Sequence, residues 1–107
     1  MKSYTDINQS KKLVEILPID SADMFWADGE RPAVWVNKDV GLDDDDVPCW
    51  SLAALLSVIP EVSLNTFKDG KWNAMVQRGD KMIYEDKDNP VDACYEMILK
   101  LKEKDLL

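Results

Sequence analysis

Residues 48–60, PCWSLAALLSVIP, carry polar side chains only at Ser51 and Ser57. Pro48 suits the first position of a helix, where its missing backbone N–H costs nothing, and Pro60 ends the segment. A helix that is apolar nearly all round is buried on most of its sides. The segment therefore predicts a helix from Pro48 to about Val58 at the centre of the fold.

The residues after this helix alternate between apolar and polar side chains. The alternation predicts three strands, at Val62–Phe67, Trp72–Gln77 and Lys81–Glu85, with turns at Asp69–Gly70 and Arg78–Gly79–Asp80. A period of two is typical of an antiparallel meander with one packed face and one wet face. We interpret Arg78–Gly79–Asp80 as a turn rather than an adhesion motif, because glycine is needed there for its geometry.

A second helix signal follows this meander. Asn89 is a favourable N-cap, Pro90 fits the first helical position, and Asp92 complements the helix dipole in the first turn. The expected apolar stripe of this helix consists of Val91, Cys94, Ile98 and Leu101.

The residues before the central helix predict a surface helix and a hairpin. The helix spans about Asp6–Leu17, and the hairpin joins Asp23–Ala27 to Ala33–Asn37 through a turn at Asp28–Gly29. Pro32 indicates that the second strand begins there or lies at a sheet edge.

Together these elements predict the order α-β-β-α-β-β-β-α. Helices and single strands do not alternate, so we expect residues 1–107 to form one two-layer α+β domain with three helices against one antiparallel sheet of about five strands. LVEILP at 13–18 and LLSVIP at 55–60 resemble each other. We interpret this echo as a common helix–proline–hairpin arrangement rather than a duplication.

The composition disfavours several function classes. The 107 residues include 13 basic and 21 acidic side chains, a net charge of −8, and no histidine. Histidine-dependent nucleophiles and histidine metal ligands are therefore impossible within one chain. The negative charge opposes nucleic-acid binding, and none of the four glycines falls in a phosphate-binding motif. We expect no enzymatic activity and no cofactor.

The cysteines and the first residues suggest a cellular compartment. Cys49 and Cys94 have no C-x-x-C spacing, and the opening MKSYTDINQS has no apolar signal region. No apolar run approaches the length of a membrane helix. We therefore expect a cytoplasmic protein whose two thiols are free and buried.

The negative charge is concentrated in one segment. Residues 20–46 contain nine acidic side chains against Arg31 and Lys38, a net charge of −7. The clustered carboxylates of Asp39 and Asp43–Asp46, and those of residues 86–92, are compatible with a calcium site. Neither segment has the glycine and closing glutamate of a calcium-binding loop. A solvated loop or a surface for a basic partner are the remaining interpretations.

Aromatic residues flank the acidic segment and complete a candidate partner-binding surface. Trp26 and Trp35 lie on the predicted hairpin beside it, and tryptophan is enriched at interaction hot spots. The predicted surface consists of Trp26, Trp35, Asp39, Asp43, Asp44, Asp45 and Asp46.

We hypothesise from this surface a protein–protein interaction module with a basic partner. One alternative is an inhibitor or immunity-type protein that covers the basic site of a nuclease-like enzyme. Another is a small-ligand-binding protein or enzyme with a pocket between the central helix and the sheet. The sequence leaves the oligomeric state open.

Three segments resemble small uncharacterised proteins of gut Bacteroidetes, some of them on phage or other mobile DNA. They are YTDINQSKKLVEILPIDSADM, PCWSLAALLSVIP and VDACYEMILKLKEKDLL, which together cover about half of the chain. The resemblance implies a bacterial cytoplasmic origin and a mobile-element setting. It implies no activity and assigns no functional residue, and Asp43–Asp46 lies outside the matching segments.

Overall fold

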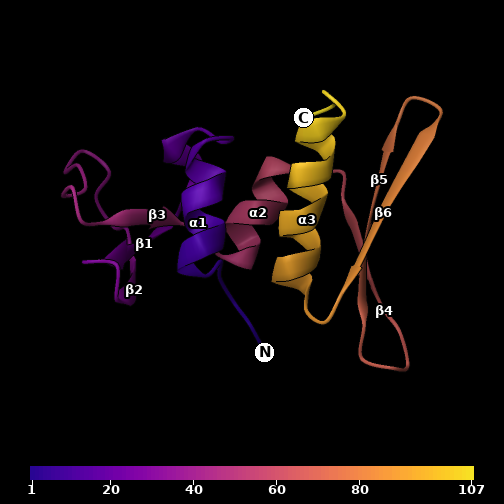
Figure 1. Ribbon diagram of the computed structural model, residues 1–107, viewed down its shortest axis with the longest axis horizontal. Coiled ribbons are helices and arrows are strands. Elements are labelled where there is room, and N and C mark those ends of the chain that lie inside the picture. Colours follow the sequence, from indigo (N-terminus) through magenta and orange to yellow (C-terminus); the bar gives the residue numbers. More distant parts are fainter.

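Three helices form a layer between two antiparallel sheets in the computed structural model, which describes residues 1–107 (Figure 1). The elements in chain order are α1 (Ile7–Val14), a 3-10 turn (Ile19–Ser21), β1 (Met24–Ala27), β2 (Arg31–Val34), β3 (Val47–Cys49), α2 (Leu52–Val58), β4 (Ser63–Thr66), β5 (Trp72–Arg78), β6 (Lys81–Lys87) and α3 (Pro90–Glu103). The α+β class and the three helices are confirmed.

The prediction of one sheet with about five strands is wrong, because six strands form two sheets of three. The sheets have the orders β2-β1-β3 and β4-β5-β6, and the helices separate them. Alternation along a strand shows which of its faces is packed. It does not show which other strands share its sheet, so the pattern could not distinguish two sheets from one.

The additional strand, β3, arises where a helix start was predicted. Pro48 lies inside β3, and α2 begins only at Leu52. The N-cap is Ser51, whose hydroxyl accepts a hydrogen bond from the Ala54 amide. A helix that began at Pro48 would have Val47 as its N-cap, and valine has no side-chain acceptor for the free amides of the first turn. The prediction of Pro48 as the first helical residue is therefore wrong.

Prolines occupy both outer strands of the first sheet. Pro32 in β2 faces Trp26 of β1, and Pro48 in β3 faces Phe25 of β1. The amide of Trp35 donates to the Asp23 carbonyl at 3.0 Å, which sets the alternation of bonded and non-bonded pairs along β1. In that alternation the nitrogens of both prolines are directed away from β1. The expected edge position of Pro32 is confirmed.

The second sheet is the predicted meander. β5 pairs with β4 and β6, and Gly79 in the β5–β6 turn has a φ of 62°. Its central strand is the second along the chain, whereas the central strand of the first sheet, β1, is the first. The two sheets therefore differ in where the third strand joins the hairpin: β3 pairs with β1, and β6 pairs with β5.

One continuous core connects both halves. Trp50, Leu55 and Ile59 are fully buried, as is the whole predicted stripe of α3. α2 has Ala54 and Leu55 buried while Ala53 and Ser57 are exposed, so only part of its circumference is covered. α3, rather than α2, packs on β5 and β6. The pocket hypothesised between the central helix and the sheet is therefore occupied by α3.

Asp92, in the first turn of α3, joins the N-terminal segment to the C-terminal helix. Its carboxylate accepts hydrogen bonds from Lys2 Nζ and Gln9 Nε2, both at 2.8 Å, and from Asn89 Nδ2 at 2.9 Å. Partial burial raises the pKa of Asp92, but these donors outweigh it and hold that pKa below its ordinary value. Burial likewise opposes the charge of Lys2, yet its carboxylate partners raise the pKa of Lys2.

Asp92→Asn is expected to lower the free energy of unfolding by about 1–2 kcal/mol at pH 7, since the hydrogen bonds to a charged acceptor weaken. The folded-state pKa is depressed, so the stabilisation is present above the unfolded pKa of about 3.9 and is lost as pH falls through the lower folded value. Urea unfolding of wild type and Asp92→Asn at pH 7 and at pH 3 measures this stabilisation. Glu96→Gln, on the same helix but without an ion pair, is the control. An equal deficit for Asp92→Asn at both pH values would contradict the charge argument.

Candidate functional site

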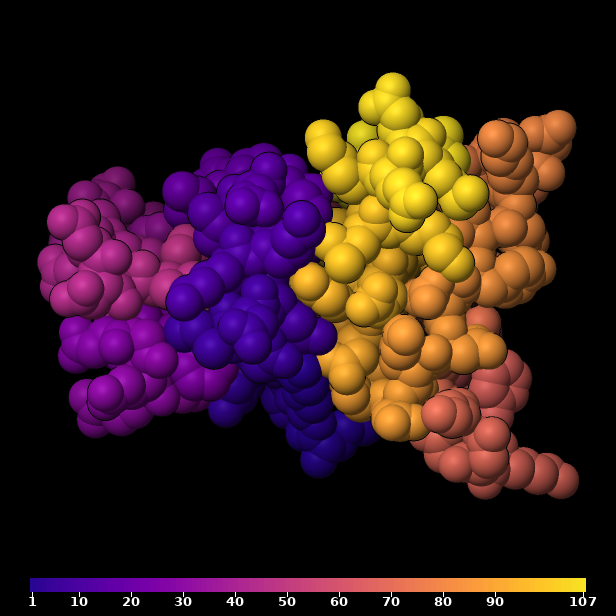
Figure 2. All heavy atoms as spheres, in the orientation of Figure 1, coloured from indigo at the N-terminus to yellow at the C-terminus, as the bar shows by residue number.

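The acidic loop, residues 38–46, connects β2 to β3 and lies against the face of the first sheet that carries Phe25. A depression of about 420 Å³ is lined by Phe25, Trp35, Val36, Asn37, Val40, Gly41, Leu42, Asp43 and Asp46. We call its apolar members Phe25, Trp35, Val36, Val40 and Leu42 the Trp35 surface. The acidic loop and the first sheet form one end of the molecule (Figure 2).

Much of the Trp35 surface is exposed to solvent. The exposed fractions of Val36 and Val40 are 88% and 65%. Ile19, which lines a neighbouring depression together with Trp35, is also half exposed. Exposed apolar residues that gather within a polar rim are typical of binding surfaces. This end of the molecule is therefore the candidate binding surface.

Trp35 is fixed in position by the acidic loop itself. Its Nε1 donates to the Val40 carbonyl at 3.4 Å, and the Lys38 ammonium lies 4.9 Å from the ring centroid. Lys38 also donates to the carbonyls of Asp20, at 2.6 Å, and Ala22. A second depression, of about 390 Å³, shares Trp35 with the first. An ordered aromatic ring between two depressions loses little entropy on binding, which favours its use as an anchor.

Asp46 differs from the other aspartates of its run because it supports the loop. Its carboxylate accepts from the Asp28 amide at 2.9 Å and from the Asp43 amide at 3.1 Å. Asp28 and Gly29, at the β1–β2 turn, both have positive φ, as the predicted turn requires. Asp46 therefore joins the acidic loop to that turn.

The other predicted acidic residues have free carboxylates. The side chains of Asp39, Asp43, Asp44 and Asp45 are exposed and enter no ion pair. Close carboxylates without a cation repel one another, and nothing in the loop brings them to a common centre. No group of three or more cysteine, aspartate or glutamate side chains is placed to hold a metal ion.

Trp26 does not belong to the Trp35 surface. Neighbouring residues of a strand point to opposite faces, so Trp26 faces away from Phe25, whose face carries Trp35. Its Nε1 donates to the Thr5 carbonyl at 3.2 Å, and its ring packs edge-to-face on Tyr4 with centroids 5.8 Å apart. These contacts join β1 to the N-terminal segment. The predicted site therefore divides between two faces of the sheet.

The sequence interpretation missed the apolar members of the surface. Val40 and Leu42 lie at alternate positions of an otherwise acidic loop, and Val36 follows Trp35. Apolar residues at alternating positions of a polar loop are a signal for a partly packed segment, although the acidic side chains dominate the pattern. Phe25 has no such signal, because only the strand register shows which face it occupies.

The two cysteines are free and buried, as predicted. Burial raises the pKa of Cys94 to about 11. Burial also raises the pKa of Cys49, although hydrogen bonds with Thr5 and Ser10 oppose it. Both thiols are therefore far from the low-pKa, accessible state of a reactive cysteine.

None of the helices is both long and apolar enough to cross a lipid bilayer. No protein-family model matches the chain, and the searches of curated proteins and of solved structures give no match either.

Proposed function

We propose that the chain is a protein-interaction module that binds a basic partner protein through the Trp35 surface and the acidic loop. The observation that supports this most is the combination of an ordered, half-buried Trp35 with exposed Val36 and Val40 next to free carboxylates. Hot spots of protein interfaces combine aromatic anchors with a surrounding rim that excludes water. No group with the geometry of a catalytic residue contributes to this proposal.

The charge of the segment specifies the chemistry of the partner. Residues 20–46 carry a net charge of −7, and Asp43, Asp44 and Asp45 have no cationic partner within the chain. Localised charge of one sign accelerates association with a surface of the opposite sign. We therefore expect lysine or arginine side chains on the partner to face these carboxylates, and an apolar side chain to contact Trp35.

The test is capture of the partner from host lysate at low salt, followed by titration of the purified pair. The variant Asp43→Ser/Asp44→Ser/Asp45→Ser removes three free carboxylates and leaves Asp46 in place. A matched control, Asp80→Ser/Glu96→Gln/Glu103→Gln, changes the net charge equally outside the acidic loop. We expect the loop variant to lose the partner, the control to retain it, and added salt to weaken the wild-type complex.

Trp35→Ala separates the apolar contribution from the charge. A hot-spot tryptophan contributes about 2 kcal/mol or more, so the affinity is expected to fall at least about thirtyfold while the salt dependence remains.

In the capture experiment, equal retention of a partner by both triple variants would place the interface elsewhere. Absence of any stoichiometric partner would count against the module itself.

Replacement of Asp46 is expected to affect stability rather than charge alone. Asp46→Ser leaves the amides of Asp28 and Asp43 without their carboxylate acceptor, which costs about 1–2 kcal/mol of unfolding free energy. Asp44→Ser removes the same charge without a hydrogen bond and is expected to stay within about 0.5 kcal/mol of wild type. Chemical denaturation of both variants measures the difference. Identical stabilities would contradict the supporting role of Asp46.

A further inference from the structure

A groove between β6 and α3 lies away from the acidic loop, on the other side of the helical layer. Its volume is about 410 Å³, and it is lined by Lys81, Met82, Ile83, Tyr84, Lys100 and Lys104. None of the lining residues is acidic, although the whole chain has eight more acidic than basic side chains. Three ammonium groups around one groove are therefore a local reversal of the overall charge.

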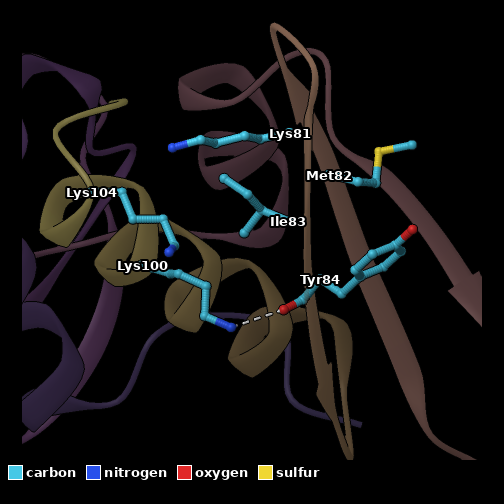
Figure 3. A pocket seen from close by; sticks show the side chains of 6 residues that line it. All are labelled: Lys81, Met82, Ile83, Tyr84, Lys100 and Lys104. Carbon is cyan, nitrogen blue, oxygen red and sulfur yellow. Dashed lines mark hydrogen bonds between the residues drawn. The ribbon is translucent and has the colours of Figure 1, made fainter.

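The side chains divide between the two faces of β6 (Figure 3). Lys81 and Ile83 extend toward α3, where Lys100 and Lys104 lie, while Met82 and the Tyr84 ring point to the other side of the strand. Ile83 is buried and forms an apolar floor between the lysines. The α3 side of β6 therefore combines positive charge with a small apolar surface.

The three lysines differ in how their charge is balanced. Lys100 Nζ lies 2.6 Å from Glu85 Oε2 and donates to the Tyr84 carbonyl at 3.1 Å, which orients it along the groove wall. Lys81 and Lys104 form no ion pair. One lysine is thus oriented and partly neutralised, and two retain an uncompensated charge.

The acidic loop does not cancel this positive charge at ordinary ionic strength. The molecule is 41 Å long, and the helical layer separates the acidic loop from β6. Because screening is strong beyond about 8 Å at physiological salt, the charge of −7 in residues 20–46 has little effect at the groove. The charged side chains that line the groove are Lys81, Lys100 and Lys104, of which Lys100 is paired with Glu85.

We infer that this lysine groove binds a small ligand that carries a phosphate group. Lysine ammonium groups are compact point charges that suit a multiply charged tetrahedral anion, whereas planar bidentate recognition would call for arginine. The groove volume lies in the range of small-molecule sites, roughly 300–1,000 Å³. Ile83 and the methylene stems of the lysines contact the uncharged part of the ligand.

This inference is independent of the proposed protein interaction, because the two surfaces share no residue. A nucleic-acid backbone is the less favoured occupant. It would extend beyond the groove over a chain of net charge −8, and the resulting repulsion opposes binding.

The experiment is a titration of the full chain with pyrophosphate at 150 mM KCl, followed by ¹H–¹⁵N correlation spectra. We expect shifts concentrated at residues 81–84 and 100–104. Lys81→Gln/Lys104→Gln removes the two unpaired charges and is expected to weaken binding about five- to tenfold, given about 0.5 kcal/mol or more for each exposed contact. The matched control Lys68→Gln/Lys102→Gln removes two lysines outside the groove and should leave the affinity within about twofold.

Four results would overturn the inference. Three of them are shifts spread over all lysines, equal weakening by the control pair, and an equal response to sulfate at matched ionic strength. The fourth is tighter binding of a single-stranded oligonucleotide at the same residues, which would indicate a nucleic-acid surface instead. Inorganic phosphate and a nucleoside monophosphate, compared with the free nucleoside, test whether the phosphate group alone is recognised.

Discussion

Trp50→Ala is expected to lower the free energy of unfolding by about 3–5 kcal/mol, the usual cost of removing a large aromatic side chain from a core. Trp50 is fully buried, and its Nε1 donates to Ser21 Oγ at 2.9 Å. Its backbone amide donates to Thr5 Oγ1 at 3.1 Å, so the residue lies where the N-terminal segment, the 3-10 turn and α2 meet. The total free energy of unfolding of a domain of this size is about 5–15 kcal/mol, so the loss is a large fraction of its stability.

Urea denaturation followed by far-ultraviolet circular dichroism measures this loss without depending on tryptophan fluorescence. Trp50→Phe retains most of the packing and is expected to recover more than half of the deficit. Trp35→Ala, at the half-buried surface residue, should cost much less. If Trp50→Ala and Trp35→Ala destabilised the fold equally, the assignment of Trp50 to the core and Trp35 to a surface would be wrong.

The native thiols are expected to react with a disulfide reagent at pH 8 more than about a hundredfold more slowly than in the urea-unfolded chain. Burial raises the pKa of Cys94 from an ordinary value of 9.0 to about 11, which alone reduces its thiolate fraction about a hundredfold. Cys49 and Cys94 are both 0% exposed, so the reagent also requires an opening of the structure.

The comparison is made on single-cysteine chains, Cys49→Ser and Cys94→Ser, with and without urea. Rapid labelling of either native thiol would show an accessible, activated cysteine and contradict its place in the core. The destabilised Trp50→Ala chain provides an internal check. Its thiols are expected to react faster than wild type, in proportion to its larger unfolded population.

Local signals predicted the elements that have strong end markers. α3 begins at Pro90 with Asn89 as its N-cap, and the turn at Gly79 joins β5 and β6 as expected. The end marker that was misinterpreted is Pro48, because a proline fits both the first turn of a helix and an edge strand. The local sequence does not distinguish a helix start from a strand at this position. The pairing of β3 with β1, in which Pro48 faces Phe25, makes it a strand.

The candidate site was predictable as a region but not as a surface. The acidic segment is visible in the sequence, yet Trp26 and Trp35 were assigned to one surface although they belong to opposite faces. The face of a strand residue depends on register, and a shift by one residue exchanges the faces. The division between the supporting Asp46 and the free Asp43–Asp45 is likewise invisible in a run of identical residues.

The prolines of the first sheet have a consequence for aggregation. Both edges of that sheet end in a strand whose proline nitrogen is directed outward, so neither edge offers a complete row of donors to an incoming strand. A second chain cannot readily extend this sheet into a ladder, even though apolar residues are exposed beside it. The protein can thus expose the aromatic face of its first sheet to solvent while the edges of that same sheet oppose fibril growth.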